Sequence, residues 1–544
     1  MKKSIPKDGF EGLKQNFSSD ALSGFLVFLL ALPLSLGIAG ASDFPPIYGL
    51  ITAMIGGLVV SLFAGSLLTI KGPAAGLIVI VAGAVSELGH GDSDLGWKLA
   101  LGAVVVAGIL QVVFGLLKLG SLSDFFPLSA VHGMLAAIGI IIISKQLHIL
   151  VGMNPLTELG KPMVEPLELL AELKNTFANF FMHKDVAIVG LVSLAIVFGW
   201  PMLPVKALKK IPSALVVLVV AIPLAMYFGI HNIADVTTAS GEVIKGFKPL
   251  LEFKKGLTDI LGINVSFDGM SQTGTFIKFV IMFALVGSLE ALLTVKAIDM
   301  LDPFKRKSNT NKDLIAVGIG NIIAGVLGGL PMISEVARSS ANVSNGAKTR
   351  WANFFHGLFI LLFLIFAVTF SDLIPKAALA AMLIGVGWKL AHPREFVHMV
   401  KIGADQIAIF VTTIIFTLAT DLLIGIAGGI VLKLILHLVR GVSFSSLFSA
   451  KSKVENNTVI LKGAAIFSNF IKVKKQLISL GYTENVTLDL TDCKLVDHSV
   501  IETLHHLKDD FHLEGGSLTI KGIGQFKNVG NSTHHLAARK KISI

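Results

Sequence analysis

The stretch GGLPMISEVARSSANVSNGAKTR, residues 328–350, places an acid, an arginine and two serines within six positions of an otherwise apolar chain. Pro331 favours extended backbone over Leu330–Ile333, and we expect a helix to begin near Ser334. Gly346 is the expected C-terminal cap of this helix. Such a helix is too short to cross a hydrocarbon core of about 30 Å. The stretch therefore predicts a half-helix that starts at membrane depth.

A second stretch of the same kind, SLLTIKGPAAGLIVIVAGAV, covers residues 66–85. Pro73 favours extended chain before it and suits the first turn of a helix, so we expect this helix to start near Ala74. Each half-helix follows the first span of its half of the chain at an interval of about 42 to 44 residues. Broken segments in corresponding positions of two halves indicate an inverted repeat.

The composition is that of an integral membrane protein. Of 544 residues, 53% are hydrophobic and 15% are charged, and the mean hydropathy is +0.76. About fourteen apolar segments are present. They fall near 21–41, 47–66, 74–88, 98–117, 126–151, 185–203, 212–230, 275–300, 313–330, 334–346, 351–371, 373–391, 404–420 and 421–440.

We therefore predict a membrane α-helical fold of 14 spans, arranged as a 7+7 inverted repeat with two half-helices. An N-terminal cytoplasmic segment covers 1–20, and the transmembrane domain covers 21–440, with repeats at about 21–230 and 275–440. Because each half has an odd number of spans, the two half-helix N-termini can face each other near the bilayer midplane.

Basic residues predict the orientation. Clusters at 2–14, 206–210, 305–312, 348–350 and 394–401 all fall on one side when spans are counted from a cytoplasmic N-terminus. Both termini are then cytoplasmic, and we expect a multi-pass protein of the bacterial inner membrane, in contact with lipid. The net charge of +10 fits this topology, with attraction of an anionic substrate as the alternative. Nucleic acid is not an expected partner, because no soluble basic domain is visible.

The composition changes near residue 452. Residues 457–467, 485–497 and 517–523 are typical of strands, and 468–481 and 499–516 are typical of amphipathic helices. We predict a small cytosolic α/β domain over 452–544. The single cysteine, Cys493, excludes an intramolecular disulfide and a cysteine-rich metal site, and no metal or cofactor is predicted.

The start of the 328–350 half-helix is the candidate anion site. A helix N-terminus offers unpaired N–H groups and a partial positive charge of roughly half a unit. Arg338 adds a full charge, and Ser339 and Ser340 add hydroxyl donors. An arginine at this depth must face a cavity or a partner. The alternative is that Arg338 pairs with Glu335, three residues away on the same helical face.

Glu290 is an isolated acid in the apolar segment GSLEALLTVKAID, and Thr294 lies four residues further along the same face. This pair could hold H⁺ or Na⁺ as a coupling ion, or Glu290 could only neutralise Arg338. The glycine-rich run at 318–329 lies in a span and indicates close helix packing rather than a nucleotide loop.

With these residues in view, the chain resembles the sulfate permease (SulP) family of anion transporters. The resemblance is carried by LALPLSLGIAGASDFPPIYGLITAMIGGLVVSLFAGS, IKGPAAGLIVIV, SLEALLT, NKDLIAVGIGNIIAGVLGGLP and ARSSANVSNGAKTRWANFFHG. The C-terminal part looks like a STAS domain, the module this family carries. The resemblance implies core and gate domains, an elevator-like mechanism and a homodimer with STAS contacts.

The resemblance also implies where the ions bind. The substrate lies between the two half-helix starts, at Ala74, Ala75, Ala337, Arg338, Ser339 and Ser340. Bicarbonate transporters of the family bind Na⁺ through an aspartate and a threonine that match Glu290 and Thr294. Glutamate replaces aspartate here, which leaves H⁺ open. Glu335 is a departure that could modulate the site, and Ser499 stands where related STAS modules carry a phosphorylated serine, with a structural role favoured here.

We therefore expect a secondary active transporter of sulfate or bicarbonate, coupled to H⁺ or Na⁺, and not an enzyme. An uncoupled anion channel or exchanger is the main alternative, and a dicarboxylate transporter of the same family is another. A receptor or scaffold that signals through the C-terminal domain is disfavoured, because a scaffold needs no broken spans.

Overall fold

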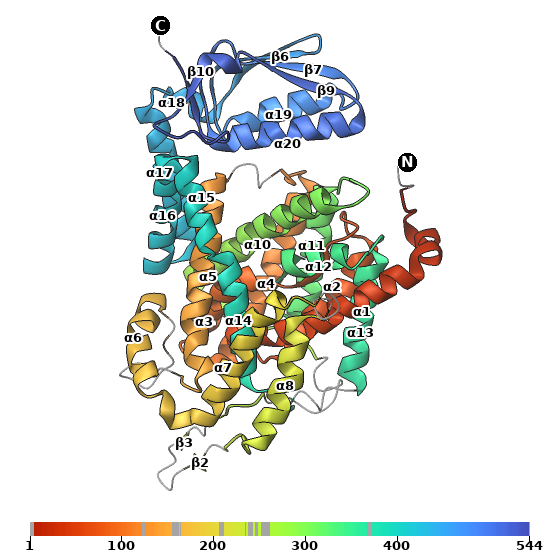
Figure 1. Ribbon diagram of the computed structural model, residues 1–544, viewed down its shortest axis with the longest axis vertical. Helices are drawn as coiled ribbons and strands as arrows, with labels where there is room; N and C mark the ends of the chain where they lie inside the picture. Colours follow the sequence, from red (N-terminus) through yellow and green to blue (C-terminus); the bar gives the residue numbers. More distant parts are fainter. Residues whose placement is uncertain are drawn as a thin grey trace. The chain divides into compact units, whose positions relative to one another are not determined.

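The computed structural model describes residues 5–121, 126–154, 163, 165–205, 211–233, 236–237, 243–244, 248–251, 262–366 and 372–542. The predicted basic cluster at 206–210 lies outside these residues. The chain forms two compact units, 1–120 with 138–389 and 121–137 with 390–544, whose elements are labelled in Figure 1.

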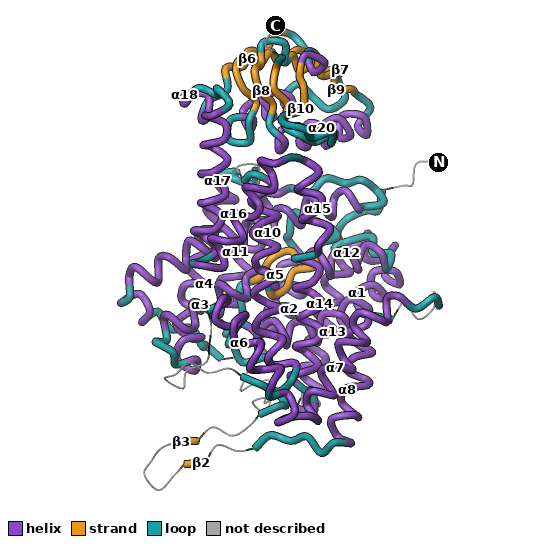
Figure 2. The backbone as a smooth tube through the Cα atoms, turned by 60° about the vertical axis from the view of Figure 1, so that its left-hand side comes forward, coloured by secondary structure: helices purple, strands orange, loops and turns teal. Residues whose placement is uncertain are grey.

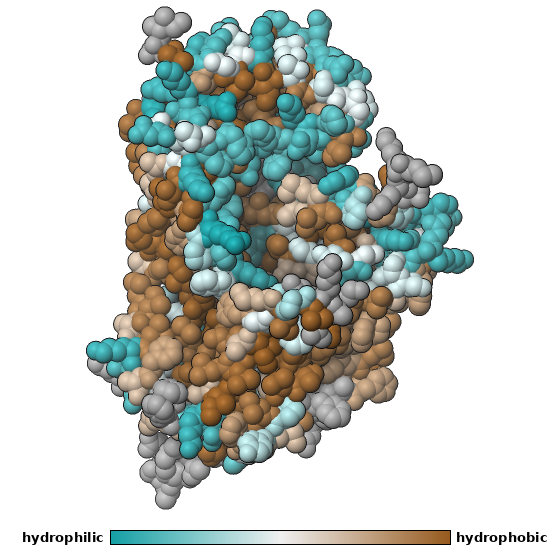
Figure 3. Space-filling view, in the orientation of Figure 1, coloured by the Kyte–Doolittle hydropathy of each residue, from teal (hydrophilic) through white to brown (hydrophobic). Residues whose placement is uncertain are grey.

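The first unit is helical. Its longer helices are α1 (Gly9–Ala41), α2 (Ile47–Leu58), α3 (Ile78–Leu88), α4 (Ser93–Leu116), α5 (Leu128–Leu150), α6 (Pro166–Ala178), α7 (Lys184–Gly199), α8 (Ser213–Tyr227), α10 (Thr273–Leu301), α11 (Thr310–Leu327), α12 (Val336–Ser344), α13 (Trp351–Phe366) and α14 (Lys376–Leu390); the first residues of α5 and the last of α14 fall in the second unit. Among the described residues, six helices of the chain are long and apolar enough to cross a membrane, and five shorter ones are apolar. The count of fourteen spans stays a prediction. The helical surface is mostly hydrophobic in Figure 3.

Two short strands lie inside this helical unit. β1 (Ile70–Pro73) pairs antiparallel with β4 (Met332–Glu335), so that Ile70 faces Glu335 and Lys71 faces Ser334. Figure 2 shows this pair in orange among the helices. We call it the crossed ribbon, because each half of the chain contributes one strand.

Each strand of the ribbon leads into a half-helix. After β1, Ala74 caps one 3₁₀ turn (Ala75–Leu77), and α3 follows. After β4, Glu335 is the N-cap of α12, which therefore begins at Val336. The predicted start at Ser334 is wrong by two residues, because pairing with β1 keeps the backbone extended as far as Glu335. Asn345 is the C-cap of α12 and the predicted cap Gly346 follows it, at φ +87°.

Helices of the two halves pack reciprocally. α4 packs along α11, where Gly108 and Gly318 bring the two backbones together, and α2 packs along α13, where Gly57 meets Gly357. A Cβ added at any of these glycines would overlap the opposite helix. The prediction that the 318–329 glycines serve helix packing is confirmed at Gly318.

The second unit joins an amphipathic helix and two apolar helices to a mixed sheet. The helices are α15 (Pro393–Ile402), α16 (Ala404–Ala419) and α17 (Leu422–Val439), followed by the short α18 (Phe444–Phe448). The seven-stranded sheet has the order β10-β11-β8-β6-β7-β9, with β5 beside β6. Its strands are β5 (Lys451–Glu455), β6 (Thr458–Ala465), β7 (Asn485–Asp489), β8 (Cys493–Val496), β9 (Ser517–Lys521), β10 (Phe526–Asn528) and β11 (Arg539–Lys541). Helices α19 (Phe470–Ser479) and α20 (His498–Glu514) lie along the sheet (Figure 1).

The predicted α/β pattern of residues 457–523 is confirmed with one difference. The predicted strand 485–497 is two strands, because the Asp489 side chain accepts a hydrogen bond from Thr491 N (2.9 Å) and turns the chain. Between them the strands bury Cys493, whose thiol donates to the carbonyl of Leu461. Burial, followed by the charges of Asp492 and Asp489, raises the pKa of Cys493 to about 12.

Candidate functional site

Arg338 lies at one face of the crossed ribbon. Its side chain is fully buried, and its Nε atom is 3.3 Å from Glu335 Oε2. The guanidinium lies against Gly72, where a Cβ would overlap Nη1. Among the described residues, Nε, Nη1 and Nη2 have no hydrogen-bond acceptor within bonding geometry. A guanidinium carries five N–H donors, so this group is buried and short of acceptors.

Glu290 approaches the same place from α10, which packs against β4, α12, α3 and the 3₁₀ turn after β1. Its carboxyl group lies on Gly76, where any side chain would overlap Oε1. Thr294 is buried one helical turn further on. The Glu335 carboxylate interacts with the backbone N–H of Ala75. Two acids and one arginine therefore meet between the starts of the two half-helices.

The remaining predicted residues divide into two groups. Ala74 is buried as the cap of the first half-helix, whereas Ala75 is half-buried and Ala337 is exposed at the start of the second. Ser339 is buried and its hydroxyl oxygen accepts a hydrogen bond from Ile70 N (2.8 Å), so it ties α12 to β1. Ser340 is partly exposed.

The opposite face of the ribbon holds a cluster that the sequence analysis missed. Lys71 is fully buried, and its Nζ atom lies 2.7 Å from Asp313 Oδ2 in the first turn of α11. The same ammonium donates to Ser334 Oγ (2.6 Å), Thr69 Oγ1 (2.8 Å) and Ser66 Oγ (3.0 Å). Strand alternation places Lys71 and Ser334 on one face and Glu335 on the other. A lysine within an apolar stretch was the available signal, since such a charge needs a partner.

His356 of α13 was also missed. It is fully buried, lies within electrostatic range of Arg338, and neither ring nitrogen has a hydrogen-bond partner among the described residues. A neutral histidine ring has one nitrogen that can accept a hydrogen bond, so His356 adds an acceptor to the surroundings of the arginine.

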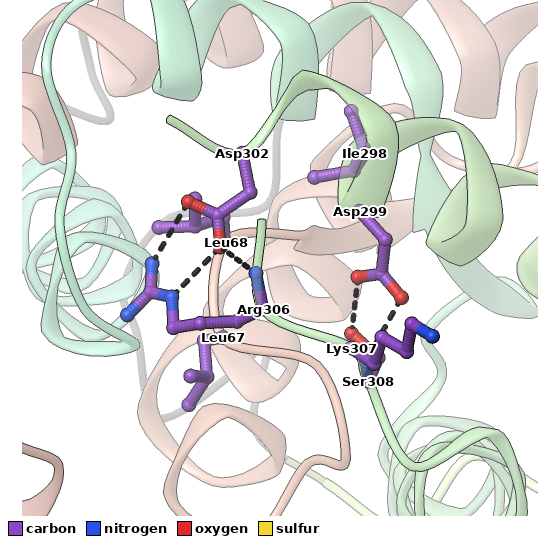
Figure 4. Close-up of a pocket in the computed structure, with 8 residues that line it drawn as sticks. All are labelled: Leu67, Leu68, Ile298, Asp299, Asp302, Arg306, Lys307 and Ser308. Atoms are coloured by element: carbon purple, nitrogen blue, oxygen red, sulfur yellow. Dashed lines mark hydrogen bonds and ion pairs between the residues drawn. The ribbon is translucent and has the colours of Figure 1, made fainter. Parts of the chain in front are cut away.

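A separate small cavity lies at the end of α10 (Figure 4). Its volume is about 10 Å³, which is room for about one water molecule and too little for an oxyanion. Its charged groups already have partners: Arg306 Nε lies 2.7 Å from Asp302 Oδ2, and Ser308 donates to both oxygens of Asp299. This cavity is not the candidate site.

A helical membrane protein in which two half-helices start at a crossed ribbon, with a buried arginine between them, belongs to the class of transmembrane anion transporters. Comparison with known proteins gives the family. The model of the sulfate permease family matches residues 17–415, and the chain belongs to this family.

Relatives cover nearly all of the chain. It is 27% identical over 519 residues to the "Putative sulfate transporter YvdB" of Bacillus subtilis, covering 94% of this chain and 92% of that protein. It is 24% identical to the bicarbonate transporter BicA of Picosynechococcus, covering 78% of this chain and 71% of that protein.

Solved structures share the fold. The transmembrane domain of a cyanobacterial BicA matches with a TM-score of 0.64 and 24% identity, covering 79% of this chain and all of that one. Murine solute carrier 26 family member A9, in its inward-facing state, matches with a TM-score of 0.63 and 15% identity, covering 92% of this chain and 85% of that one. The chain is thus a multi-pass membrane protein of a sulfate and bicarbonate transporter family, and its C-terminal sheet is consistent with a STAS domain.

Proposed function

We propose that this protein is a secondary active transporter that moves sulfate or bicarbonate, with the anion bound between the two half-helix starts. The observation that carries the proposal is the buried Arg338 guanidinium, whose donors lack acceptors among the described residues. An oxyanion supplies several acceptor oxygens and a compensating charge. Its hydrogen bonds to a guanidinium are of the charge-assisted, strong kind.

The proposed anion site between the two half-helix starts is called the seat below. Ala75 and Ala337 line it with small side chains. Ala75 contributes the backbone N–H at the start of one half-helix, and Ala337 lies in the first turn of the other. Ser339 and Ser340 are the hydroxyl donors, and Ser339 Oγ also accepts from Ile70 N, which ties the half-helix to β1. Both helix dipoles then favour negative charge at the same point.

Coupling follows from the charges around the seat. With Glu290 and Glu335 both ionised, one arginine faces two carboxylates, and an incoming anion is repelled. Uptake of a proton by an acid removes that repulsion, which favours H⁺ as the coupling ion. Na⁺ bound by Glu290 and Thr294 is the alternative, since carboxylate and hydroxyl oxygens are hard ligands.

The broader arrangement in this proposal rests on the family. It comprises 14 spans, an elevator-type movement of a core domain, and a homodimer in the bacterial inner membrane with both termini cytoplasmic. The described basic clusters at 305–312, 348–350 and 394–401 support that orientation. The STAS domain is expected to sit in the cytoplasm.

Uptake of labelled sulfate and bicarbonate into proteoliposomes, with H⁺ and Na⁺ gradients imposed separately, tests the proposal. We expect concentrative uptake of at least one anion under one gradient, and its loss in Glu290→Gln. Uptake that only equilibrates, and that ignores both gradients, indicates the uncoupled channel or exchanger. Competition by a dicarboxylate but by neither inorganic anion indicates the dicarboxylate transporter.

A further inference from the structure

We propose that the Glu335 side chain is a tethered anion that occupies the substrate seat of the empty transporter and must be displaced for substrate to bind. This inference rests on the proposed function and assigns a regulatory role to one residue of that site.

The contacts of Glu335 are those that an anionic substrate would need. Its Oε2 atom pairs with Arg338 Nε at 3.3 Å, and its carboxylate interacts with the N–H of Ala75 at the opposite half-helix. The carboxylate therefore lies beside Arg338 of α12 and near the start of the other half-helix. It is the N-cap residue of α12, yet its side chain makes no cap hydrogen bond, so the carboxylate is turned toward Arg338 and not onto the N–H groups of the first turn.

The Glu335 carboxylate is only weakly bound by its neighbours. Oε1 has no hydrogen-bond partner among the described residues, and Arg338 lacks a well-formed hydrogen bond there at all three nitrogens. A bidentate arginine–carboxylate pair would fill two donors with two parallel bonds. A single contact at 3.3 Å leaves donors that a tetrahedral or trigonal oxyanion can take. The tether is therefore a competitor that can be removed, not a permanent counter-charge.

The charged and titratable groups around Glu335 set how it is released. Glu290 from α10 repels it, Arg338 attracts it, and His356 from α13 lies within electrostatic range of the arginine. Lys71 and Asp313 lie behind the ribbon and neutralise each other. Protonation of Glu335 removes its attraction to Arg338 and clears the seat. Anion affinity is then expected to rise as the pH falls.

Sulfate binding to the purified full-length protein tests this inference, because sulfate remains a dianion between pH 5.5 and pH 8. We expect the parent to bind sulfate at least tenfold more tightly at pH 5.5 than at pH 8. Glu335→Gln, which keeps the shape and removes the charge, should bind at least tenfold more tightly than the parent at pH 8 and keep only the smaller pH dependence that comes from Glu290.

Glu290→Gln is the matched control. It removes the charge of a neighbouring acid that forms no ion pair with Arg338. It should gain less affinity at pH 8 than Glu335→Gln, because it removes repulsion but leaves the Glu335 carboxylate beside Arg338. Glu335→Asp retains the charge on a shorter tether and should give an intermediate affinity with the pH dependence preserved. It also reports whether the site folds when this position is changed.

Each result decides between the two proposals. If the parent binds sulfate and Glu335→Gln binds no more tightly, the tether is refuted while anion binding stands. If Glu335→Gln and Glu290→Gln gain equally, the effect is general electrostatics and the tether is again refuted. If neither the parent nor any variant binds sulfate or, at pH 8, bicarbonate, the proposed function fails.

Discussion

The two faces of the crossed ribbon bury the same kinds of charge in opposite ways. On one face, Lys71 meets Asp313 and three hydroxyl groups, so every proton of its ammonium has an acceptor. On the other, Arg338 has one loose contact with Glu335 and none of its nitrogens is hydrogen-bonded among the described residues. The backbone between them is the same four-residue pairing.

This difference suits one face of the ribbon to a structural role and the other to ligand binding. A buried charge costs several kcal/mol unless it is paired and hydrogen-bonded. The Lys71 face meets that requirement internally and therefore fixes β1, β4 and α11 to one another. The Arg338 face leaves the requirement unmet, which is useful only if a ligand meets it. Under the proposed function, the Lys71 cluster holds the ribbon in place while Arg338 exchanges its partner.

Removal of Asp313 should have the largest effect. Asp313→Ala leaves the Lys71 ammonium buried without its counter-charge, and we expect a loss of about 3–5 kcal/mol in the free energy of unfolding. Thermal unfolding of the purified protein measures this loss. Arg338→Ala is the comparison. It removes a buried charge whose hydrogen bonds are not formed, so it should cost far less stability. Equal losses in the two variants would remove the distinction between the faces.

Removal of Arg338 should instead weaken binding. Arg338→Ala deletes the donors of the proposed seat, and we expect anion affinity to fall by about 1–3 kcal/mol, the scale of a charged hydrogen bond. Titration of the folded variant with sulfate and bicarbonate measures it. Lys71→Met combined with Asp313→Leu is the control, since it changes the opposite face only. Unchanged affinity in folded Arg338→Ala would contradict the assignment of the seat.

A third buried cluster, at the start of α20, allows the comparison to be made by pH. Lys433 of α17 pairs with Asp497 at 3.2 Å and donates to Ser499 Oγ, while His498 Nδ1 lies 2.7 Å from the carbonyl of Leu536. Burial opposes ionisation of Asp497, but Lys433 and His437 outweigh it and hold its pKa well below the usual range. The Lys433–Asp497 ion pair, like the Lys71–Asp313 pair, is therefore hydrogen-bonded within the protein.

Burial, then the charge of Lys433, lowers the pKa of His498 to about 4. An unfolded histidine has a pKa of about 6.5, so the stability this group contributes is complete above that value and falls as the pH drops toward 4. We expect His498 to account for a loss of about 2 kcal/mol between pH 7 and pH 5. Chemical unfolding at both pH values measures it, and His498→Gln should flatten the slope by that amount. An unchanged slope would show that His498 is protonated in the folded protein.

The smallest change is expected when both members of the satisfied pair become apolar. Lys71→Met with Asp313→Leu removes the desolvation cost together with the attraction, and such replacements are often neutral or stabilising. We expect the unfolding free energy to stay within about 1.5 kcal/mol of the parent. Transport by this variant then shows whether the pair only holds the ribbon. A collapse of stability would mean that the hydroxyl groups around Lys71 depend on the ion pair.

Much of this arrangement is predictable from the sequence. Pro73 and Pro331, set beside short apolar segments, locate both half-helices to within a few residues. The alternating and amphipathic patterns after residue 452 predict the α/β domain. These are local signals: turn chemistry and periodicity act over a few residues, and tertiary pairing with β1 shifted only the start of α12, by two residues.

The pairings across the ribbon were not predictable in the same way. β1 and β4 are four-residue strands from opposite halves, too short for a pattern, and only the fold brings Lys71 to Asp313. Ser339 is expected to donate to the anion, and that stays a prediction, whereas the hydrogen bond that its oxygen accepts from Ile70 N could not be foreseen before the strands were paired. Arg338 and Glu335 are neighbours in sequence, so their contact was foreseeable, whereas the N–H of Ala75 beside that carboxylate was not.

The lone cysteine has a practical consequence for spectroscopy. Cys493 lies within the sheet with its thiol bonded to the Leu461 carbonyl, and a pKa near 12 keeps the sulfur protonated at working pH. Maleimides and spin-label reagents attack the thiolate, so this residue should stay unmodified in the folded protein. The natural chain can therefore accept a single engineered cysteine at Ala337, and a label there would report directly on the opening of the half-helix start.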